Sequence, residues 1–562
     1  MQEIFHFIMI KPTHYDDDGY PIQWLKSLIP SNSLACVYGL SQSCKDRHVL
    51  GEHVEIRLHA IDEYNSRVNT EALIAMIKRD GGMALVGMVG VQSNQFPRAI
   101  DLSLPFLAQD IPVCIGGFHV SGCFSMLDEM PKDMVDAQKL GISFFAGEAE
   151  GQRLDKLLID AYKGAVKPIY NHLDDLPGLP DEPIPFLPRE QVEHTYGTYS
   201  SFDLGRGCPF KCSFCTIINV QGRKSRFRSA DDLERIIRKN HDIGVHSFFL
   251  TDDNFARNKN WEACLDRVID LREQEGIEVR FSIQIDTLCH KIRGFVEKCC
   301  KAGVDQIFIG LENINTENLL AVKKRQNKIS GYKEQILAWK QYPVVICAGY
   351  IVGFPGDTKE SLLEDVETIK RELAIDHIYF TVLTPLPGCE DHQAMYQKGE
   401  WMDPDLNKYD LNHMVTKHPT LSDAEWKEAY EAVWNHFYTF EHMETIFKRM
   451  VAMRSNKKLT TLHRLLFYRE FKRVFHVHPL EGGFLRLKYR KDRRPSFPVE
   501  PAVVFYPKFV KETLFTMGKA IPTYIRLRLM LKRIWTDPSR FEYVDQAITP
   551  ISEDSSGRIS NI

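Results

Sequence analysis

The chain has 562 residues, of which 44% are hydrophobic, and this is enough for two or three domains with large cores. The formal net charge of −4 argues against binding of nucleic acid through overall charge. The 13 cysteines lack a secreted spacing pattern, so we expect reduced thiols in a cytoplasmic protein. No uncharged apolar run reaches the roughly 18 residues of a membrane span, and the N-terminus predicts a first strand rather than a signal peptide.

Residues 1–165 alternate apolar runs with helical segments. The predicted strands are Ile4–Ile10, Val54–Leu58, Ala84–Val91, Val113–Ile115 and Ile142–Phe145. Helical patterns such as Thr70–Lys78 and Pro97–Leu107 lie between them. This alternation predicts an α/β domain with a doubly wound, Rossmann-like parallel sheet.

Polar and glycine-rich loops follow these strands. They are residues 11–19, Gln92-Ser93-Asn94, Gly116-Gly117-Phe118-His119-Val120-Ser121 and Gly147-Glu148-Ala149-Glu150. Ligands of doubly wound sheets lie beyond the carboxyl ends of the strands, and glycine lets a ligand approach the backbone. The loops therefore predict a cofactor site, although a flavodoxin-like domain with a nucleotide, or with no ligand, has the same pattern.

Residues 166–198 are rich in proline, which predicts an extended linker. Directly after it, residues 204–215 read Leu-Gly-Arg-Gly-Cys-Pro-Phe-Lys-Cys-Ser-Phe-Cys. The glycines and the proline predict a tight loop that can turn Cys208, Cys212 and Cys215 toward one point. Three thiolates cannot complete a four-ligand zinc site, but they can hold three irons of a [4Fe–4S] cluster and leave the fourth open. A zinc loop with a distant fourth ligand, or thiols without a role, is the alternative.

Residues 199–395 again alternate strands and helices. The predicted strands are Ser200–Leu204, Ser247–Thr251, Glu278–Ile285, Gln306–Gly310, Val344–Val352 and His377–Leu383. Six βα units predict a partial TIM barrel, whose active residues would follow the strands. Polar side chains stand at those places, and each of them taken singly is as typical of a helix cap or an exposed group as of a ligand site.

Residues 396–562 are predicted to be mainly helical. Residues 422–440 place Trp426, Tyr430, Val433, Trp434 and Phe437 at helical spacing, which is typical of a core-facing helix. Residues 448–494 are basic, and residues 524–535 mix cationic and apolar side chains. A helix packed on the domain is one interpretation of 524–535, and peripheral contact with anionic lipid is the other.

The Cys-x3-Cys-x2-Cys loop with an aromatic residue before its last cysteine resembles the signature of radical S-adenosylmethionine (SAM) enzymes. The Gly-Gly-Phe-His and Gly-Glu-Ala-Glu loops resemble the cobalamin-binding domain that precedes the radical SAM domain in one large subfamily. The resemblance to cobalamin-dependent radical SAM enzymes covers residues 1 to about 440. It implies a [4Fe–4S] cluster, SAM and cobalamin as cofactors.

The same resemblance implies roles for individual residues. Cys208, Cys212 and Cys215 would bind the cluster. The residues expected to contact SAM are Phe214, Asp252, Asp253, Asn254, Gln284, Asp286 and Glu312. The residues expected to contact cobalamin are Gln92, Ser93, Asn94, Gly116, Gly117, His119, Ser121, Gly147 and Glu148.

One element of other cobalamin proteins is missing, namely the Asp-x-His-x-x-Gly sequence that supplies a histidine to cobalt. His14 precedes Asp16, Asp17 and Asp18, in the wrong order and spacing. The resemblance therefore implies cobalamin without a histidine ligand. The loop around Ser93 is the expected neighbour of the lower face of cobalt.

The resemblance implies methylation of an unactivated carbon. In that family one SAM methylates cob(I)alamin, and a second is cleaved to a deoxyadenosyl radical that removes a hydrogen atom from the substrate. A non-methylating cyclisation or rearrangement and a non-catalytic corrinoid or iron–sulfur sensor are the alternatives. The expected partners are a small-molecule or lipid-like substrate and an electron donor such as flavodoxin or ferredoxin, without nucleic acid.

Overall fold

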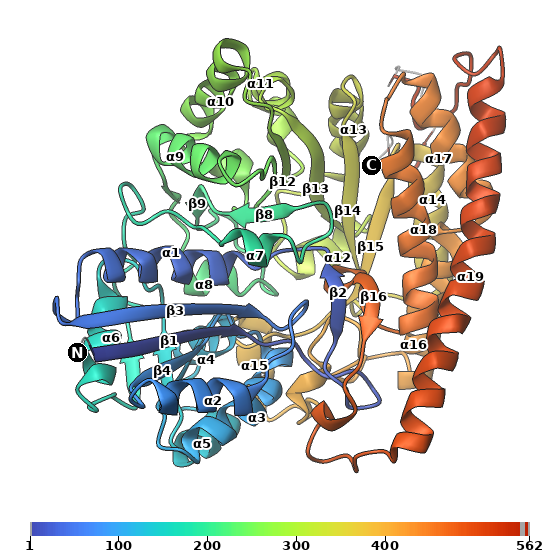
Figure 1. Ribbon diagram of the computed structural model, residues 1–562. Helices are drawn as coiled ribbons and strands as arrows, with labels where there is room; N and C mark the ends of the chain where they lie inside the picture. Colours follow the sequence, from blue (N-terminus) through green and yellow to red (C-terminus); the bar gives the residue numbers. More distant parts are fainter. Residues whose placement is uncertain (1–2, 551–556, 560–562) are drawn as a thin grey trace.

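The computed structural model describes residues 3–550 and 557–559, which form two parallel sheets and a layer of C-terminal helices (Figure 1). Within these residues, no helix combines the length and the apolar character needed to cross a bilayer. The arrangement is the predicted one, a Rossmann-like domain followed by a partial barrel and a mainly helical region.

The first sheet has six strands in the order β3-β1-β4-β5-β6-β7, and every neighbouring pair is parallel. The strands are β1 (Glu3–Lys11), β3 (Val54–Asp62), β4 (Ala84–Met88), β5 (Val113–Gly116), β6 (Ser143–Ala146) and β7 (Ile169–Asn171). The helices are α1 (Asn32–Asp46), α2 (Thr70–Arg79), α3 (Phe96–Leu107), α4 (Phe118–Met126), α5 (Lys132–Lys139) and α6 (Arg153–Tyr162). The strand order reverses between β1 and β4, and such a switch point is where ligands bind in these sheets.

The second sheet also has six strands, all parallel, in the order β15-β14-β13-β12-β11-β8. They are β8 (Tyr199–Phe202), β11 (Ser247–Leu250), β12 (Arg280–Ile285), β13 (Val304–Glu312), β14 (Val345–Val352) and β15 (His377–Val382). The covering helices are α9 (Ala230–His241), α10 (Trp261–Glu275), α11 (Phe295–Lys301), α12 (Thr316–Ala321), α13 (Tyr332–Lys340) and α14 (Lys359–Glu372). Because β8 and β15 do not pair, the barrel is open, as predicted.

The predicted linker is only partly extended. Its residues 169–171 form β7 at the edge of the first sheet, and α7 (Arg189–Val192) follows. A three-residue strand with exposed Ile169 gives no periodic signal, so the sequence pattern did not predict it.

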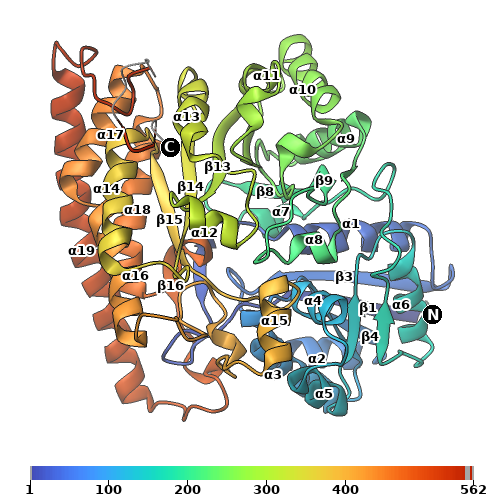
Figure 2. The ribbon, with the colours of Figure 1, turned by 180° about the vertical axis from the view of Figure 1, so that it is seen from behind.

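The C-terminal region folds back over both sheets. It contains α15 (Glu390–Lys398), α16 (Asp423–Phe437), α17 (Phe440–Ala452), α18 (Lys458–Phe475), β16 (Gly483–Leu487) and α19 (Ala502–Thr536). The aromatic face of α16 is buried, which confirms its prediction as a core-facing helix. Figure 2 shows α15 beside α4 of the first domain, and Gln393 Nε2 donates to the Met126 carbonyl at 2.5 Å. β16 pairs with β2 (Gln23–Ser27), which lies outside the first sheet.

Candidate functional site

The three cysteines lie on the loop that follows β8 at the carboxyl end of the barrel. The loop starts with the short strand β9 (Gly205–Arg206), which pairs with β10 (Arg226–Phe227). Gly207 has a φ of +90°, and a Cβ atom there would lie 2.4 Å from the Lys224 carbonyl oxygen, so only glycine fits. The Cys208 amide donates to the Gly222 carbonyl at 3.2 Å and closes the loop.

The thiols of this loop differ in exposure. Cys212 is buried, whereas Cys208 and Cys215 are partly exposed. Burial raises the pKa of Cys208 to about 11 and that of Cys215 to about 12, so binding of iron at these sulfurs would release protons. Among residues 3–550 and 557–559, no group of three or more His, Cys, Asp or Glu side chains is arranged to hold a single metal ion. Three sulfur donors on one loop fit an iron–sulfur cluster.

Two aspartates after β11 hold the backbone of the cysteine loop. Asp252 accepts from the Leu204 amide and Asp253 from the Gly207 amide, each at 2.7 Å. Burial raises the pKa of both carboxyl groups to about 7. The structure therefore brings this predicted pair against the cysteine loop, where both side chains support it. Their contact with SAM stays a prediction.

The other polar groups after β11 and β12 lie beside this pair. Asn254 Nδ2 donates to Asp286 Oδ2 at 2.9 Å, and the Arg257 guanidinium binds Asp286 through bonds of 2.6 and 2.9 Å. Gln284 Nε2 donates to the Asp252 carbonyl at 3.4 Å. Asn254 Oδ1 and Thr251 Oγ1 are buried and have no hydrogen-bond partner. Such buried acceptors fit the ammonium group or hydroxyls of a ligand such as SAM.

The predicted cobalamin loops contact one another at the carboxyl edge of the first sheet. His119 Nδ1 lies 3.2 Å from Ser93 Oγ, and its Nε2 lies 3.0 Å from Asp133 Oδ2. The Gly147 amide donates to Ser121 Oγ at 3.0 Å. Gln92 begins the turn η1 (Ser93–Gln95) and Gly116 ends β5, so the predicted set lies along one edge.

Two residues of the predicted cobalamin set, Gly117 and Glu148, already make close contacts within the protein. A Cβ atom on Gly117 would lie 2.1 Å from the Val91 amide nitrogen, so close backbone packing already requires this glycine. Glu148 forms ion pairs with Arg206, at 2.8 Å, and with Arg226. In contrast, Asn94 Oδ1 is buried without a partner, which suits a polar ligand such as cobalamin at this edge.

Arg206 joins the two loop systems. Its guanidinium binds Glu148 at 2.8 Å and Glu150 at 2.6 Å in the first domain, and Asp203 at 3.0 Å in the barrel. Burial opposes ionisation of Glu150, but the charge of Arg206 outweighs it and lowers the pKa of that carboxyl group. The loops at the carboxyl ends of β6 and β8 are therefore held together by a buried charge cluster.

Comparisons with known proteins agree with this geometry. The family model "Radical SAM superfamily" matches residues 203–369, which include the cysteine loop and strands β11 to β14. Residues 203–369 are therefore a radical SAM domain.

Relatives and solved structures extend the likeness beyond the radical SAM domain. The bacteriochlorophyllide d C-12(1)-methyltransferase of Chlorobaculum tepidum is 25% identical over 55% of this chain and 64% of its own length. The hopanoid C-2 methylase of Rhodopseudomonas palustris is 23% identical over 65% of this chain and 67% of its own length. The matches span 41% to 74% of the lengths of the curated relatives compared. In fold, the chain is similar to the radical SAM methyltransferase TsrM of Kitasatospora setae, with a TM-score of 0.53, 14% identity, and coverage of 79% of this chain and 86% of that one.

The radical SAM domain also contains residues near the cysteines that sequence reasoning missed. Gln326 Nε2 lies 3.4 Å from Cys212 Sγ, and the Lys324 ammonium is 5.7 Å from the centre of the Phe214 ring. Lys324 forms an ion pair with Glu312. Both Lys324 and Gln326 follow α12 and not a strand, so the pattern of polar residues after strands did not predict them as site residues.

Glu312 itself has an unusual backbone. It lies at the end of β13, where the strand register shifts against β14, and its φ is +62°. Non-glycine residues in this region are strained and occur often at functional sites. The predicted SAM residue Glu312 therefore has the strained, positive-φ backbone that is common at functional sites.

A residue of the C-terminal region reaches the edge of the first sheet. Glu481 Oε2 lies 2.7 Å from His14 Nε2, and its Oε1 accepts from Asn94 Nδ2 at 2.8 Å. His14 is buried in this contact. Sequence reasoning missed Glu481 because its partners lie hundreds of residues away and no local motif surrounds it.

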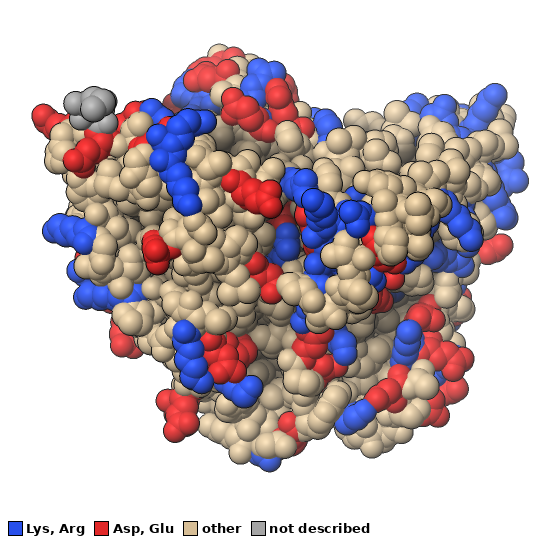
Figure 3. Space-filling model, turned by 60° about the horizontal axis from the view of Figure 1, so that its bottom comes forward, with Lys and Arg blue, Asp and Glu red and all other residues tan. Residues whose placement is uncertain are grey.

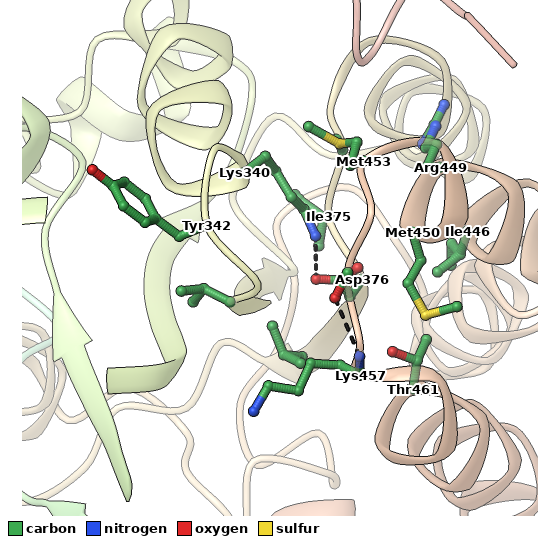
Figure 4. Close-up of a pocket in the computed structure, with 14 residues that line it drawn as sticks. Lys340, Tyr342, Ile375, Asp376, Ile446, Arg449, Met450, Met453, Lys457 and Thr461 are labelled. Atoms are coloured by element: carbon green, nitrogen blue, oxygen red, sulfur yellow. Dashed lines mark hydrogen bonds and ion pairs between the residues drawn. The ribbon is translucent and has the colours of Figure 1, made fainter. Parts of the chain in front are cut away.

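One cavity lies at the other end of the radical SAM domain. Figure 4 shows Lys340 pointing toward Asp376, 2.5 Å away, beside Met450, Met453 and Thr461. The cavity has a volume of about 10 Å³ and lies at the amino ends of β14 and β15. That volume is about one water molecule, and residues at this end of a barrel support stability. The site is therefore at the opposite, carboxyl end.

Proposed function

We propose that this protein is a cobalamin-dependent radical SAM enzyme that transfers a methyl group to an unactivated carbon. The observation that carries the proposal is the contact through Arg206 between the three-cysteine loop and the carboxyl edge of a Rossmann-like sheet. Relatives named as a hopanoid methylase and as bacteriochlorophyllide methyltransferases support it. So does the fold shared with TsrM, a structure described with cobalamin and a [4Fe–4S] cluster.

The cofactors supply the difficult chemistry, since cluster-bound SAM provides a hydrogen-abstracting radical and cobalamin provides the methyl group. Cys208, Cys212 and Cys215 would hold three irons of the cluster. Asp252 and Asp253 fix the backbone that carries them, through the Leu204 and Gly207 amides.

Other residues would bind and orient the ligands. Thr251 Oγ1 and Asn254 Oδ1 would accept hydrogen bonds from SAM, and Asn94 Oδ1 would do so from cobalamin, because all three atoms are buried without partners. His14 is bound to Glu481, which fits cobalamin held without a histidine ligand.

A second candidate is a non-methylating radical cyclisation or rearrangement. It is favoured by the anaerobic magnesium-protoporphyrin IX monomethyl ester cyclase of Rubrivivax gelatinosus, which is 27% identical over 245 residues. The product distinguishes the two reactions. A methyltransferase adds one methylene unit to the mass of its substrate, whereas cyclisation or rearrangement does not.

The proposal also includes partners. A small or lipid-like molecule would be the substrate, and a protein such as flavodoxin or ferredoxin would supply the electron for SAM cleavage. We place the enzyme in the cytoplasm with peripheral contact to a membrane.

The cysteine loop can be tested directly. Protein purified without oxygen and supplied with iron, sulfide and cobalamin should bind about four irons and a corrinoid. When it is also given a low-potential one-electron reductant, it should convert SAM to methionine and 5'-deoxyadenosine. Cys208→Ala, Cys212→Ala and Cys215→Ala should each abolish that conversion. Cys300→Ala, a partly exposed cysteine of α11, is the matched control and should keep it. Normal SAM cleavage by any of the three loop variants would refute the assignment.

A further inference from the structure

The C-terminal helix α19 has two apolar faces, and only one of them is covered. Phe505, Thr523, Leu527, Leu531 and Ile534 are buried against the protein. The opposite side carries a second row, whose members are four or seven residues apart and therefore lie on one face of the helix. Its members are Val503 (82% exposed), Val510 (54%), Leu514 (63%), Ile521 (51%), Ile525 (51%) and Leu529 (63%), and we call them the outer stripe.

The outer stripe is long and continuous with neighbouring apolar groups. The 35 residues of α19 extend for about 50 Å at the helical rise. Tyr506, Pro507 and Phe515 join Val510 and Leu514, with Lys511 beside them, in a shallow and mostly apolar surface on the helix. Contiguous exposed apolar surface of this kind marks an interaction site.

The same helix is strongly cationic. It contains seven Lys and Arg residues and one acidic residue, Glu512; the cations are Lys508, Lys511, Lys519, Arg526, Arg528, Lys532 and Arg533. The difference, 7 − 1, gives a net charge of +6, whereas the whole chain carries −4. In Figure 3, Lys and Arg side chains gather along the right-hand side of the molecule, where α19 lies in Figure 1.

Several of these cations are available to a partner. Lys508 pairs with Asp18, and Arg533 with Glu444. Over residues 3–550 and 557–559, no carboxylate forms an ion pair with Lys511, Lys519 or Lys532.

The basic stretch 448–494 contains cations that form ion pairs within the protein. Arg449 pairs with Asp545, Lys457 with Asp305 and Arg494 with Asp405. These three cations are used within the protein, whereas α19 combines a long row of exposed apolar residues with cations that form no ion pair among the described residues.

We infer that α19 is a membrane-docking helix that lies flat on an anionic lipid surface. Its outer stripe would enter the boundary between headgroups and acyl chains, and the flanking cations would bind lipid phosphates. Pairing of α19 with a second copy is less favourable, because it would bring two helices of net charge +6 together. This inference goes beyond the proposed reaction and does not depend on it.

The test uses the full chain and two matched double variants. Leu514→Glu with Leu529→Glu adds two charges to the outer stripe, at side chains that are each 63% exposed. Leu104→Glu with Leu140→Glu makes the same chemical change on the first domain, at side chains that are 39% and 51% exposed. Removal of α19 is a poor test, since it would also remove Leu527 and Leu531 and expose the apolar surface that they cover.

The measurement is co-sedimentation with phosphatidylcholine vesicles, with and without phosphatidylglycerol, at low and moderate salt. The unmodified chain should pellet with the anionic vesicles and lose binding as salt rises. The α19 variant should bind at least about tenfold more weakly, while the Leu104/Leu140 variant should bind normally. Equal melting temperatures of the two variants would show that both fold.

A charge series gives an independent measure. Each of Lys511→Gln, Lys519→Gln and Lys532→Gln should weaken partition into anionic vesicles about fivefold. Lys132→Gln and Lys163→Gln, on the first domain, should leave it unchanged. Absent or salt-insensitive pelleting would overturn the inference. So would a dimer in lipid-free buffer that the Leu514/Leu529 variant converts to monomer. SAM cleavage by the same variants reports on the proposed reaction separately.

Discussion

Arg206 is a buried cation whose carboxylate partners come from two domains. It is 8% exposed, and Glu148, Glu150 and Asp203 are all buried around it. A buried ion cluster contributes little net stability as a whole, but loss of one member leaves uncompensated charges. Because Arg206 stands two residues before Cys208, it can also set the position of the cysteine loop against the first domain.

Arg206→Met should therefore lower the free energy of unfolding by about 3–5 kcal/mol. The change should also weaken iron retention, since the loop loses its contact with Glu148 and Glu150. Arg238→Met is the matched control, because Arg238 pairs with Glu234 and Glu275 at the surface. Arg238→Met should lower the free energy of unfolding by less than about 1 kcal/mol. Thermal unfolding measures the loss of stability, and iron content measures the loss of the cluster. Equal losses of stability and of iron in the two variants would contradict this role for Arg206.

The sequence predicts some residues of the candidate site and misses others. Asp252, Asp253 and Asn254 were predictable as a group because they directly follow an apolar strand, and the structure places them beside the cysteine loop. Their partners, the Leu204 and Gly207 amides, were not predictable, since they depend on how the loop turns. Gln326 and Glu481 were missed for the same reason, as only the folded chain brings them to Cys212 and His14.

Helix α4 and the chain after β15 meet through two glycines. A Cβ atom on Gly122 would lie 2.3 Å from the Pro387 carbonyl oxygen, and one on Gly388 would lie 2.7 Å from the Cα of Gly122. Gly388 also has a φ of +100°, which favours glycine. This contact lets the first domain and the end of the barrel approach at backbone distance.

Gly122→Ala should destabilise the protein by about 1–3 kcal/mol, because the added methyl group meets backbone that cannot move freely. Gly518→Ala is the matched control within a helix, since a Cβ atom there meets nothing within 4 Å. It should stabilise α19 by about 0.5–1 kcal/mol through helix propensity. The melting temperatures of the two variants should shift in opposite directions, and a shift of the same sign in both would refute the contact.

Apart from β7, the strands of both sheets were predictable because they are apolar runs bounded by turns. The pairing of β2 with β16 was not predictable, since it joins two short strands far apart in the sequence. The extent of α19 was missed as well. Pro507 and Pro522 lie within it, and an internal proline normally ends a helix. Packing of Leu527, Leu531 and Ile534 on the protein outweighs that local preference.

At the scale of the whole molecule, the C-terminal region completes the first domain. Trp24 of β2 is fully buried, with ring centres of Phe471 and Phe475 at 5.1 and 5.0 Å. Its indole Nε1 donates to the Glu481 carbonyl at 2.9 Å. The segment that contains Glu481 is thereby held against the edge where His14 and Asn94 lie. The sequence motifs stop before this region, although the candidate cobalamin edge depends on it.

Trp24→Ala should lower the free energy of unfolding by about 3–5 kcal/mol, because it leaves a large cavity between β2, β16 and α18. Hydrogen exchange should rise in β16 and in residues 479–481, which lose their main packing partner. Trp401→Ala is the control, since Trp401 is 49% exposed and should change stability by less than about 0.5 kcal/mol. Unchanged exchange in β16 would argue against this coupling.

The pairing of β2 with β16 also sets the order in which a newly made chain can fold. Residues 23–27 are synthesised about 460 residues (483 − 23) before their partners at 483–487. At about 5–20 residues per second, roughly 20–90 s separate the two events. Trp24 has no Phe471 or Phe475 to pack against during that time, so the first domain is synthesised before its packing partners and can be completed only after them.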